Sequence, residues 1–289
     1  MSAVLRIGAR TDVGRVRAGN EDSLLVSDDG RLIVVADGMG GHQGGEVASA
    51  TAVATLRAEV EAGRSVEDAV VAANRAVLER ADGDPTLRGM GTTVTGGIVE
   101  GSSLRIAHVG DSRAYLLRDG ALRQVTVDHS VVAELIAAGE LTEEEALVDR
   151  RRSMITRALG IERDVVVDVV TVDLRGGDRL LLCSDGLTTM LRDPAIHGIL
   201  ADTTDPDAAA VALVDAANAA GGADNITVIV ADVTVVEDTV VEDTVTGDTV
   251  AEDRTPDDRH PTVTEAATPG EPTPEAAPRR RWWSRRAPS

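Results

Sequence analysis

The stretch from Leu32 to Glu46, LIVVADGMGGHQGGE, places the strongest constraint on what this chain can fold into. Its first five residues, Leu32 to Ala36, form an apolar run with the length and β-branched content of a buried strand. The run ends at Asp37, and a glycine-rich turn follows. A carboxylate at the end of a buried strand must be solvated, capped or paired with a cation. We therefore expect Asp37 to bind a divalent metal ion, with the other ligands supplied by the rest of the chain.

Composition narrows the class of protein. The chain has 289 residues, of which 43% are hydrophobic, and it lacks Phe, so we expect a sizeable and aliphatic core. A net charge of −20 argues against nucleic-acid binding, which needs a basic surface. The single cysteine, Cys183, excludes an intrachain disulfide, fits a reducing cytosol and is expected to be an inert core residue. Neither a signal peptide nor a run of about 20 apolar residues is present, which predicts a cytoplasmic protein without a transmembrane segment.

Hydrophobic periodicity predicts a chain rich in both strands and helices. The expected strands span residues 3–10, 24–27, 31–36, 92–99, 104–109, 114–118, 122–125, 165–174, 179–183 and 226–236. The expected helices span residues 45–62, 66–81, 130–138, 194–200 and 206–219, with a short one opened by the capping box Thr142-x-x-Glu145. The four strands between residues 92 and 125 are expected to form an antiparallel meander. The polar, Arg-rich segment of about residues 128–160 has the character of a surface insertion that forms a lid.

The composition changes near residue 236, which predicts a folded domain over residues 1–236 and a disordered tail over 237–289. The tail is acidic and rich in Pro and Thr, and it begins with five-residue units of the TVVED type that start at Thr234, Thr239, Thr244 and Thr249. These threonines are either phosphorylated by a partner kinase and bound by an Arg-lined phosphothreonine-reading domain, or parts of a solvated spacer.

The tail ends in a basic and aromatic cluster that contains Trp282 and Trp283 among five arginines. This cluster suits weak peripheral contact with an anionic membrane surface, and a purely disordered end is the alternative.

Four acids occupy the same kind of position in the sequence: each lies at the end of an apolar strand, beside a turn. They are Asp37, Asp111, Asp185 and Asp224. Any one Asp-Gly pair is most often only a turn. Four acids gathered at one edge of a sheet pair, however, would repel each other unless a cation neutralised them. Their hard oxygen ligands favour Mg²⁺ or Mn²⁺ with several retained waters.

Two such ions about 3.5–4 Å apart would lower the pKa of a bridging water, and an anionic phosphoryl group is the electrophile that fits best. An arginine must then hold the phosphate oxygens. Arg17 is the candidate because it lies in the polar segment just before Glu21 and Asp22. The alternative for Arg17 is an ordinary surface charge.

Eight sequence blocks occur in an order that resembles one protein family. They are VRAGNED (16–22), VADGMGGHQGGEVAS (35–49), GTTV (91–94), HVGDSRAYLLRDG (108–120), TVDHS (126–130), TRALG (156–160), LLLCSDGL (180–187) and DNITVIV (224–230). Together they are similar to the metal-dependent (PPM, type 2C) Ser/Thr protein phosphatases in their compact bacterial form, over about residues 3–232. The fold that this resemblance implies is α+β: a four-layer α/β/β/α sandwich of two packed antiparallel sheets flanked by helices, with a small helical flap at 128–160.

The resemblance also implies a role for each site residue. Asp37 would bridge two metal ions, and the Gly38 carbonyl would bind one of them, while Asp185 and Asp224 would complete the metal shell. Asp22 would act through bound water, with Glu21 beside it, and Asp111 would hold a third, weaker metal ion. Arg17 would bind the substrate phosphate. His42 is either a general acid that protonates the departing Ser or Thr oxygen or a surface residue.

Three functions compete on these residues. The first is a Mn²⁺- or Mg²⁺-dependent phosphatase that acts on phosphoserine and phosphothreonine in proteins and opposes a cytosolic Ser/Thr kinase. The second is a catalytically inactive relative that only binds phosphoproteins, which predicts the loss of at least one ligand. The third is a phosphatase of an anti-sigma-factor antagonist, with the same chemistry and another substrate. Because Arg17 and the four strand-end acids are all present, we favour the first, acting as a monomer.

Overall fold

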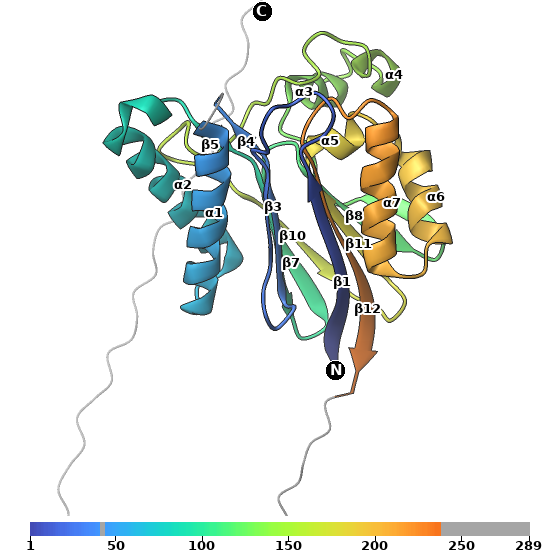
Figure 1. Ribbon diagram of the computed structural model, residues 1–289. Helices are drawn as coiled ribbons and strands as arrows, with labels where there is room; N and C mark the ends of the chain where they lie inside the picture. Colours follow the sequence, from blue (N-terminus) through green and yellow to red (C-terminus); the bar gives the residue numbers. More distant parts are fainter. Residues whose placement is uncertain (41–43, 238–289) are drawn as a thin grey trace, which may run out of the picture. The chain divides into compact units, whose positions relative to one another are not determined.

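Two five-stranded antiparallel sheets lie face to face in the computed structural model, which describes residues 1–40 and 44–237 (Figure 1). The first sheet has the order β1 (Ser2–Asp12), β12 (Ile226–Val236), β11 (Arg179–Cys183), β8 (Arg113–Arg118) and β9 (Ala121–Gln124). The second has the order β10 (Asp168–Asp173), β7 (Ser103–Val109), β6 (Val94–Glu100), β3 (Leu32–Ala36) and β2 (Ser23–Val26). A two-stranded ribbon of β4 (Gly38–Met39) and β5 (Gly91–Thr92) lies directly after Asp37. The unit Met1–Val240 contains all the described residues.

Helices cover the outer face of each sheet, which confirms the predicted α/β/β/α sandwich. The long pair α1 (Gly44–Glu61) and α2 (Val66–Gly83) packs on the second sheet, and the 3₁₀ turn η1 (Pro85–Leu87) follows it. The pair α6 (Asp193–Asp202) and α7 (Pro206–Ala219) packs on the first sheet. Helix α2 begins where the sequence predicts, because the Ser65 side chain accepts a hydrogen bond from the Asp68 amide.

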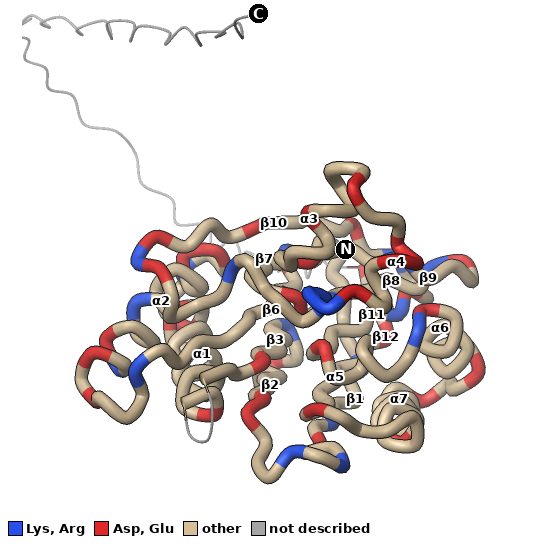
Figure 2. The backbone as a smooth tube through the Cα atoms, turned by 90° about the horizontal axis from the view of Figure 1, so that it is seen from above, with Lys and Arg blue, Asp and Glu red and all other residues tan. Residues whose placement is uncertain are grey.

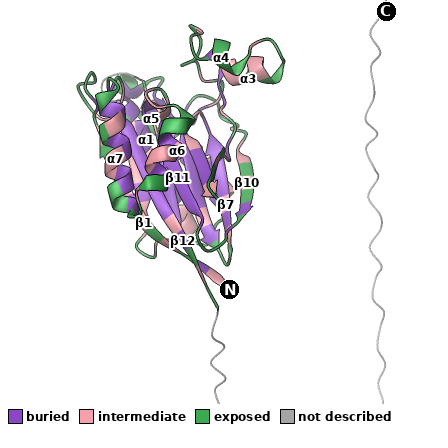
Figure 3. Cartoon of the chain, turned by 90° about the vertical axis from the view of Figure 1, so that its right-hand side faces the viewer, coloured by how far each residue is buried: buried purple, intermediate pink, exposed green. Residues whose placement is uncertain are grey.

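The strands have continuous apolar runs because both of their faces are buried. In β3, Val34 contributes to the core under α1 and α2, whereas Ile33 and Val35 contribute to the core between the sheets. In β11, Leu182 faces the other sheet and Leu181 faces α6 and α7. Figure 3 shows the same pattern as buried strands with more exposed helices outside them. The strands thus form the inside of the molecule, and the strand ends are left for polar groups.

The expected meander between residues 92 and 125 is wrong in its connectivity. Strands β6 and β7 pair in one sheet, but β8 and β9 pair in the other, so the chain changes sheets at Gly110 and Asp111. The pattern of strands and turns did not reveal this change, because both arrangements alternate strand and turn in the same way. Among the other differences, β10 begins at Asp168 rather than at 165. Asp185 opens a short helix, α5 (Asp185–Thr188).

The segment 128–160 contains two short helices, α3 (Val131–Ala137) and α4 (Glu143–Ala146). The predicted capping box at Thr142 is confirmed, since Thr142 and Glu145 each bond the other's backbone amide. Helix α3 buries none of its residues, although its sequence has an apolar face. Two backbone hydrogen bonds join the beginning of this segment to its end. The Thr156 amide donates to the His129 carbonyl, and the Val131 amide donates to the Met154 carbonyl.

No helix among the described residues is long and apolar enough to cross a bilayer. The first of the four repeat threonines, Thr234, lies in β12 opposite Val4 with an exposed side chain. The other repeat threonines and the Trp282–Trp283 pair lie outside the described residues. Cys183 is buried in β11, as predicted.

Candidate functional site

Strand ends at one end of the sandwich deliver the predicted acids. Asp37 joins β3 to β4, and Asp111 lies between β7 and β8. Asp185 follows β11 as the first residue of α5, and Asp224 lies two residues before β12. Asp22 directly precedes β2. Acidic segments accordingly lie beside both β2 and α5 in the view down this end of the molecule (Figure 2).

The acids lie close enough to perturb each other strongly. The pKa of Asp37 is raised well above its usual value, first by burial and then by the charges of Asp22, Asp185, Asp111 and Asp224. The pKa of Asp185 is also raised by burial and by Asp224, while a hydrogen bond with Asp37 opposes the rise. The structure therefore brings together all four strand-end acids together with Asp22, although they are far apart in the sequence.

One carboxylate oxygen of Asp22 accepts a hydrogen bond from a side chain, and the other accepts none. Its Oδ2 accepts a hydrogen bond of 2.7 Å from Ser184 Oγ, whereas its buried Oδ1 has no hydrogen-bond partner. Burial, together with the charges of Asp185 and Asp224, raises the pKa of Asp22 to about 6. Burial and Asp185 likewise raise the pKa of Asp111 to about 7. An unpartnered buried carboxylate oxygen beside other acids is a natural position for a cation or its bound water.

Threonines of the GTTV block fix the backbone of Asp37. The Asp37 amide donates to Thr93 Oγ1 at 3.0 Å, and the Thr92 hydroxyl donates to the Asp37 carbonyl at 2.9 Å. Thr93 also shares a hydrogen bond of 2.7 Å with Ser112, the residue after Asp111. One buried hydroxyl pair therefore links the backbone of Asp37 to the residue that follows Asp111.

Arg17 lies on the exposed loop between β1 and β2 and reaches the acids from outside. Its Nη2 lies 2.7 Å from Asp224 Oδ2. The hydrogen bond with Asp224 raises the pKa of Arg17, and Glu21 and Asp37 contribute further. Arg17 is therefore next to the acid cluster, with about half of its side chain accessible to solvent.

Glu21 and Gly38 lie side by side in the structure. The Gly38 amide donates to the Glu21 carbonyl at 3.2 Å. The Glu21 carboxylate lies against Gly45 in the first turn of α1, so close that a Cβ on Gly45 would come within 2.3 Å of it. A side chain on Gly38 would similarly collide with the Gly45 carbonyl. His42, the candidate general acid, lies outside the described residues.

The donor chemistry of this cluster fits Mg²⁺ or Mn²⁺, since every candidate ligand is a hard oxygen. Within residues 1–40 and 44–237, however, no group of three or more His, Cys, Asp or Glu side chains forms a ready-made metal cage. In this arrangement Asp224 is hydrogen-bonded to Arg17, and Asp22 to Ser184.

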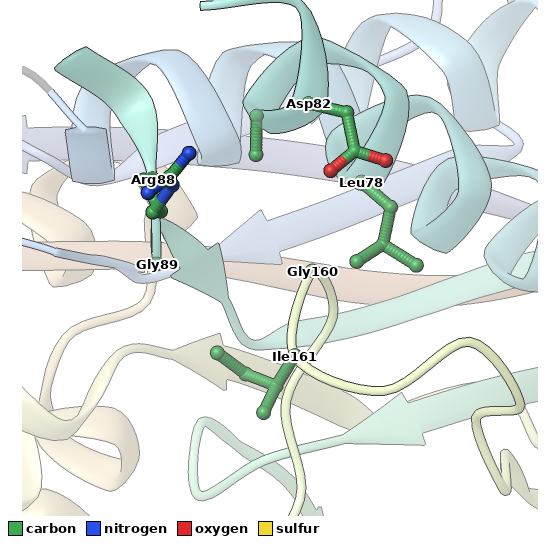
Figure 4. A pocket seen from close by; sticks show the side chains of 7 residues that line it. Leu78, Asp82, Arg88, Gly89, Gly160 and Ile161 are labelled. Atoms are coloured by element: carbon green, nitrogen blue, oxygen red, sulfur yellow. The ribbon is translucent and has the colours of Figure 1, made fainter. Parts of the chain in front are cut away.

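A cavity of about 300 Å³ lies apart from this cluster, between α2 and the loop that leaves the flap (Figure 4). Leu78 and Asp82 of α2 line one side of it, Arg88 and Gly89 another, and Ile161 lies opposite. None of the predicted site residues lines this cavity, so it plays no part in the site.

Sequence reasoning missed the polar residues that hold the acids. Ser184 and Thr93 lie inside two of the eight sequence blocks that resemble the family. Neither has a periodicity or spacing that indicates a contact with Asp22 or Asp37. Ser184 meets Asp22 across 162 residues of chain, which only the fold brings about.

Comparisons with known proteins point to one family. The sequence profile of the family described as "Protein phosphatase 2C" matches residues 15–216. The serine/threonine protein phosphatase PstP of Mycobacterium tuberculosis is 43% identical over 239 residues, which cover 81% of this chain and 46% of the relative. This chain thus spans about half the length of that relative. The serine/threonine phosphatase stp of Listeria welshimeri is 41% identical, over 77% of this chain and 94% of its own.

Solved structures give the same result. The catalytic domain of PstP in complex with two manganese ions has a TM-score of 0.74 and 42% identity, over 80% of this chain and 99% of that chain. The phosphatase MsPP of Mycobacterium smegmatis, in complex with cacodylate, has a TM-score of 0.72 and 40% identity, over 80% and 99% of the two chains.

Proposed function

Because the chain belongs to the protein phosphatase 2C family, we propose that it is a metal-dependent protein phosphatase acting on phosphoserine and phosphothreonine. The observation that carries the proposal is the convergence of five aspartates from separate segments beside Arg17. A structural role does not account for such a cluster, since the buried acids repel each other and destabilise the fold when they are ionised.

Residues of the cluster divide into ion ligands and a phosphate clamp. Asp37, Asp185, Asp224 and the Gly38 carbonyl would hold two Mn²⁺ or Mg²⁺ ions, with Asp22 acting through water and Glu21 beside it. Asp111 would hold a third, weaker ion. When bound, such ions lower the pKa of a coordinated water and neutralise charge on a phosphoryl group. The relative PstP, which contains two manganese ions, supports this assignment.

Arg17 would bind the phosphate oxygens through its planar guanidinium. Its partner Asp224 is also a proposed ion ligand, so the same carboxylate would serve both Arg17 and an ion. With Asp224 engaged by an ion, the donors of Arg17 would be available to the substrate phosphate. His42 would protonate the departing Ser or Thr oxygen, because a histidine pKa near neutrality suits that step.

The finer parts of the proposal concern partners and location. We place the protein in the cytoplasm as a monomer that opposes a Ser/Thr kinase on that kinase's phosphorylated substrates. The repeat threonines of the tail would be phosphorylated and bound by a phosphothreonine-reading domain. Mass spectrometry of the protein from its native cells tests the tail, because a tail without phosphate under all growth conditions removes this part.

Hydrolysis of a phosphothreonine peptide tests the activity. We expect phosphate release with Mn²⁺, none with a chelator, and a loss of activity in Asp185→Asn. An Asp185→Asn variant as fast as the parent would contradict the assignment of the acids. A parent protein that binds the phosphopeptide without hydrolysing it would instead identify an inactive binding relative.

A further inference from the structure

The loop that carries Arg17 is held by one buried side chain, that of Asn225. Asn225 Nδ2 donates to the Val13 carbonyl and to the Gly19 carbonyl, both at 2.9 Å, and its Oδ1 accepts from the Glu21 amide at 2.8 Å. The side chain thereby uses both donors and its acceptor on the backbone of a single loop. It is also almost fully buried, at 4% exposure, so water does not compete for these bonds.

The three bonds lie on both sides of Arg17. Val13 precedes it, and Gly19 and Glu21 follow it, whereas residues 15–19 are exposed. Near the root of the loop, the Arg15 amide donates to the Gly222 carbonyl at 2.7 Å. The position of the Arg17 backbone is therefore set mainly by bonds at the two ends of the loop, and Asn225 supplies three of them.

Asn225 is also the residue that follows Asp224. Its own amide donates to Asp224 Oδ1 at 2.9 Å, while Asp224 Oδ2 accepts from Arg17 at 2.7 Å. The Arg17 loop also packs closely against the backbone of Asp224. A Cβ on Gly14, whose φ is +81°, would come within 2.2 Å of the Asp224 carbonyl oxygen. The Asn225 side chain thus joins the strand end that supplies a proposed ion ligand to the loop that supplies the proposed phosphate ligand, in addition to the Arg17–Asp224 pair.

We propose that Asn225 is a positioning residue that fixes Arg17 for phosphate binding relative to the acid cluster. This inference rests on the proposed role of Arg17 in the phosphatase. Without Asn225, the ends of the loop lose their anchor, and Arg17 samples positions from which its guanidinium does not meet the phosphate. An orienting residue behind a ligand typically contributes a ten- to hundredfold effect, and a displacement of about 1 Å at a reacting group has a similar effect.

The chain offers a matched control in Asn74. This residue is fully buried and also makes three bonds to the backbone of one loop: it donates to the Glu162 and Arg163 carbonyls at 2.9 and 3.1 Å and accepts from the Gly160 amide at 2.8 Å. Asn74 therefore has the same chemistry and burial as Asn225, but it holds the loop that leaves the flap instead of the Arg17 loop.

The test uses the full chain in four variants: Arg17→Ala, Asn225→Ala, the double variant and Asn74→Ala. Phosphate binding is measured as the inhibition constant for inorganic phosphate and as the shift of the melting temperature with phosphate in Mn²⁺. Affinity for Mn²⁺ alone is measured by calorimetry. Hydrogen exchange then reports opening of the segments 13–21 and 160–163.

We expect Asn225→Ala to weaken phosphate binding by about tenfold, to leave Mn²⁺ affinity within about twofold and to speed exchange in 13–21. In the Arg17→Ala background, Asn225→Ala should cause no further loss, because the two residues act through one guanidinium. Asn74→Ala should speed exchange in 160–163 and leave phosphate binding unchanged. If Asn225→Ala does not fold, Asn225→Asp keeps the acceptor for Glu21 and removes the two donors, and the same direction is expected.

Two outcomes overturn the inference: additive losses in the double variant, or an equal loss of phosphate binding in Asn74→Ala. Two other results would instead contradict the proposed function on which this inference rests. If Arg17→Ala binds phosphate as well as the parent, the phosphate role of Arg17 is wrong, and if the parent fails to hydrolyse a phosphothreonine peptide, the phosphatase proposal is wrong.

Discussion

The interior of the β-sandwich and its acidic end are made from the same strands, yet they contribute to stability with opposite signs. All five residues of β3 are buried and apolar, and the next residue is Asp37. In β11 the apolar run ends at Cys183, two residues before Asp185. Burial of aliphatic side chains stabilises the interior, whereas burial of neighbouring carboxylates raises their pKa and destabilises the end at neutral pH. Burial of the aliphatic core therefore offsets the cost of gathering acids at the end of the sandwich.

The largest expected effect concerns the acidic end. Asp37→Asn should slow hydrolysis of a phosphothreonine peptide by on the order of a thousandfold or more, because the variant loses a ligand that is worth several kcal/mol of transition-state stabilisation. In chelator, its melting temperature should equal or exceed that of the parent, since one repelling charge is removed. If Asp37→Asn is inactive and also clearly less stable than the parent, the buried acids do not destabilise this end of the molecule. Asp28→Asn, at a side chain that is 95% exposed, is the control for charge removal.

The interior should respond in the opposite way. Leu182→Ala, at a fully buried position between the sheets, should lower the free energy of unfolding by about 2–5 kcal/mol through lost burial and a residual cavity. Urea denaturation in the presence of chelator measures this loss. Val148→Ala, at an exposed position, is the control and should change stability by less than about 0.5 kcal/mol. Equal losses at the two positions would remove the distinction between interior and surface.

The acidic end should also respond to pH. Asp22 and Asp111 have folded-state pKa values of about 6 and about 7, above their unfolded values. Their contribution to stability is thus fully present below about pH 4 and is lost as pH rises through 6 and 7. Added Mn²⁺ should therefore raise the melting temperature by several degrees more at pH 8 than at pH 5. Melting curves with Mn²⁺ and with chelator at both pH values measure this difference, which Asp22→Asn should reduce.

The smallest expected effect lies in the flap. Leu135→Ala, on a helix that buries none of its residues, should change the free energy of unfolding by less than about 1 kcal/mol. If this apolar face contacts phosphoprotein substrates, the variant should slow their dephosphorylation more than that of a small aryl phosphate. Equal rates relative to the parent on both substrates would assign the face no part in substrate binding.

Much of this architecture could be predicted because its determinants are local. Apolar runs such as Leu32–Ala36 and capping residues such as Ser65 signal an element within a few residues of chain. The passage between sheets at Gly110 and Asp111 could not be predicted, because the choice of sheet depends on which faces are covered elsewhere. The four-residue helix α5 is too short to have a periodicity.

For the site, the sequence indicated the acids but not what holds them. Asp37, Asp185 and Asp224 stand out as charges at the ends of apolar strands. Asn225 does not, since its bonds to Val13 and Gly19 join residues more than 200 positions apart. His42 remains a prediction, because it lies outside the described residues.

The hydrogen bonds that join residues 129 and 156, and 131 and 154, have a consequence for how this fold can diversify. Because the two ends of the excursion are fastened to each other, the residues between them can change in length and sequence while the sheets keep their register. The segment 128–160 is therefore the part of this fold that can vary most freely.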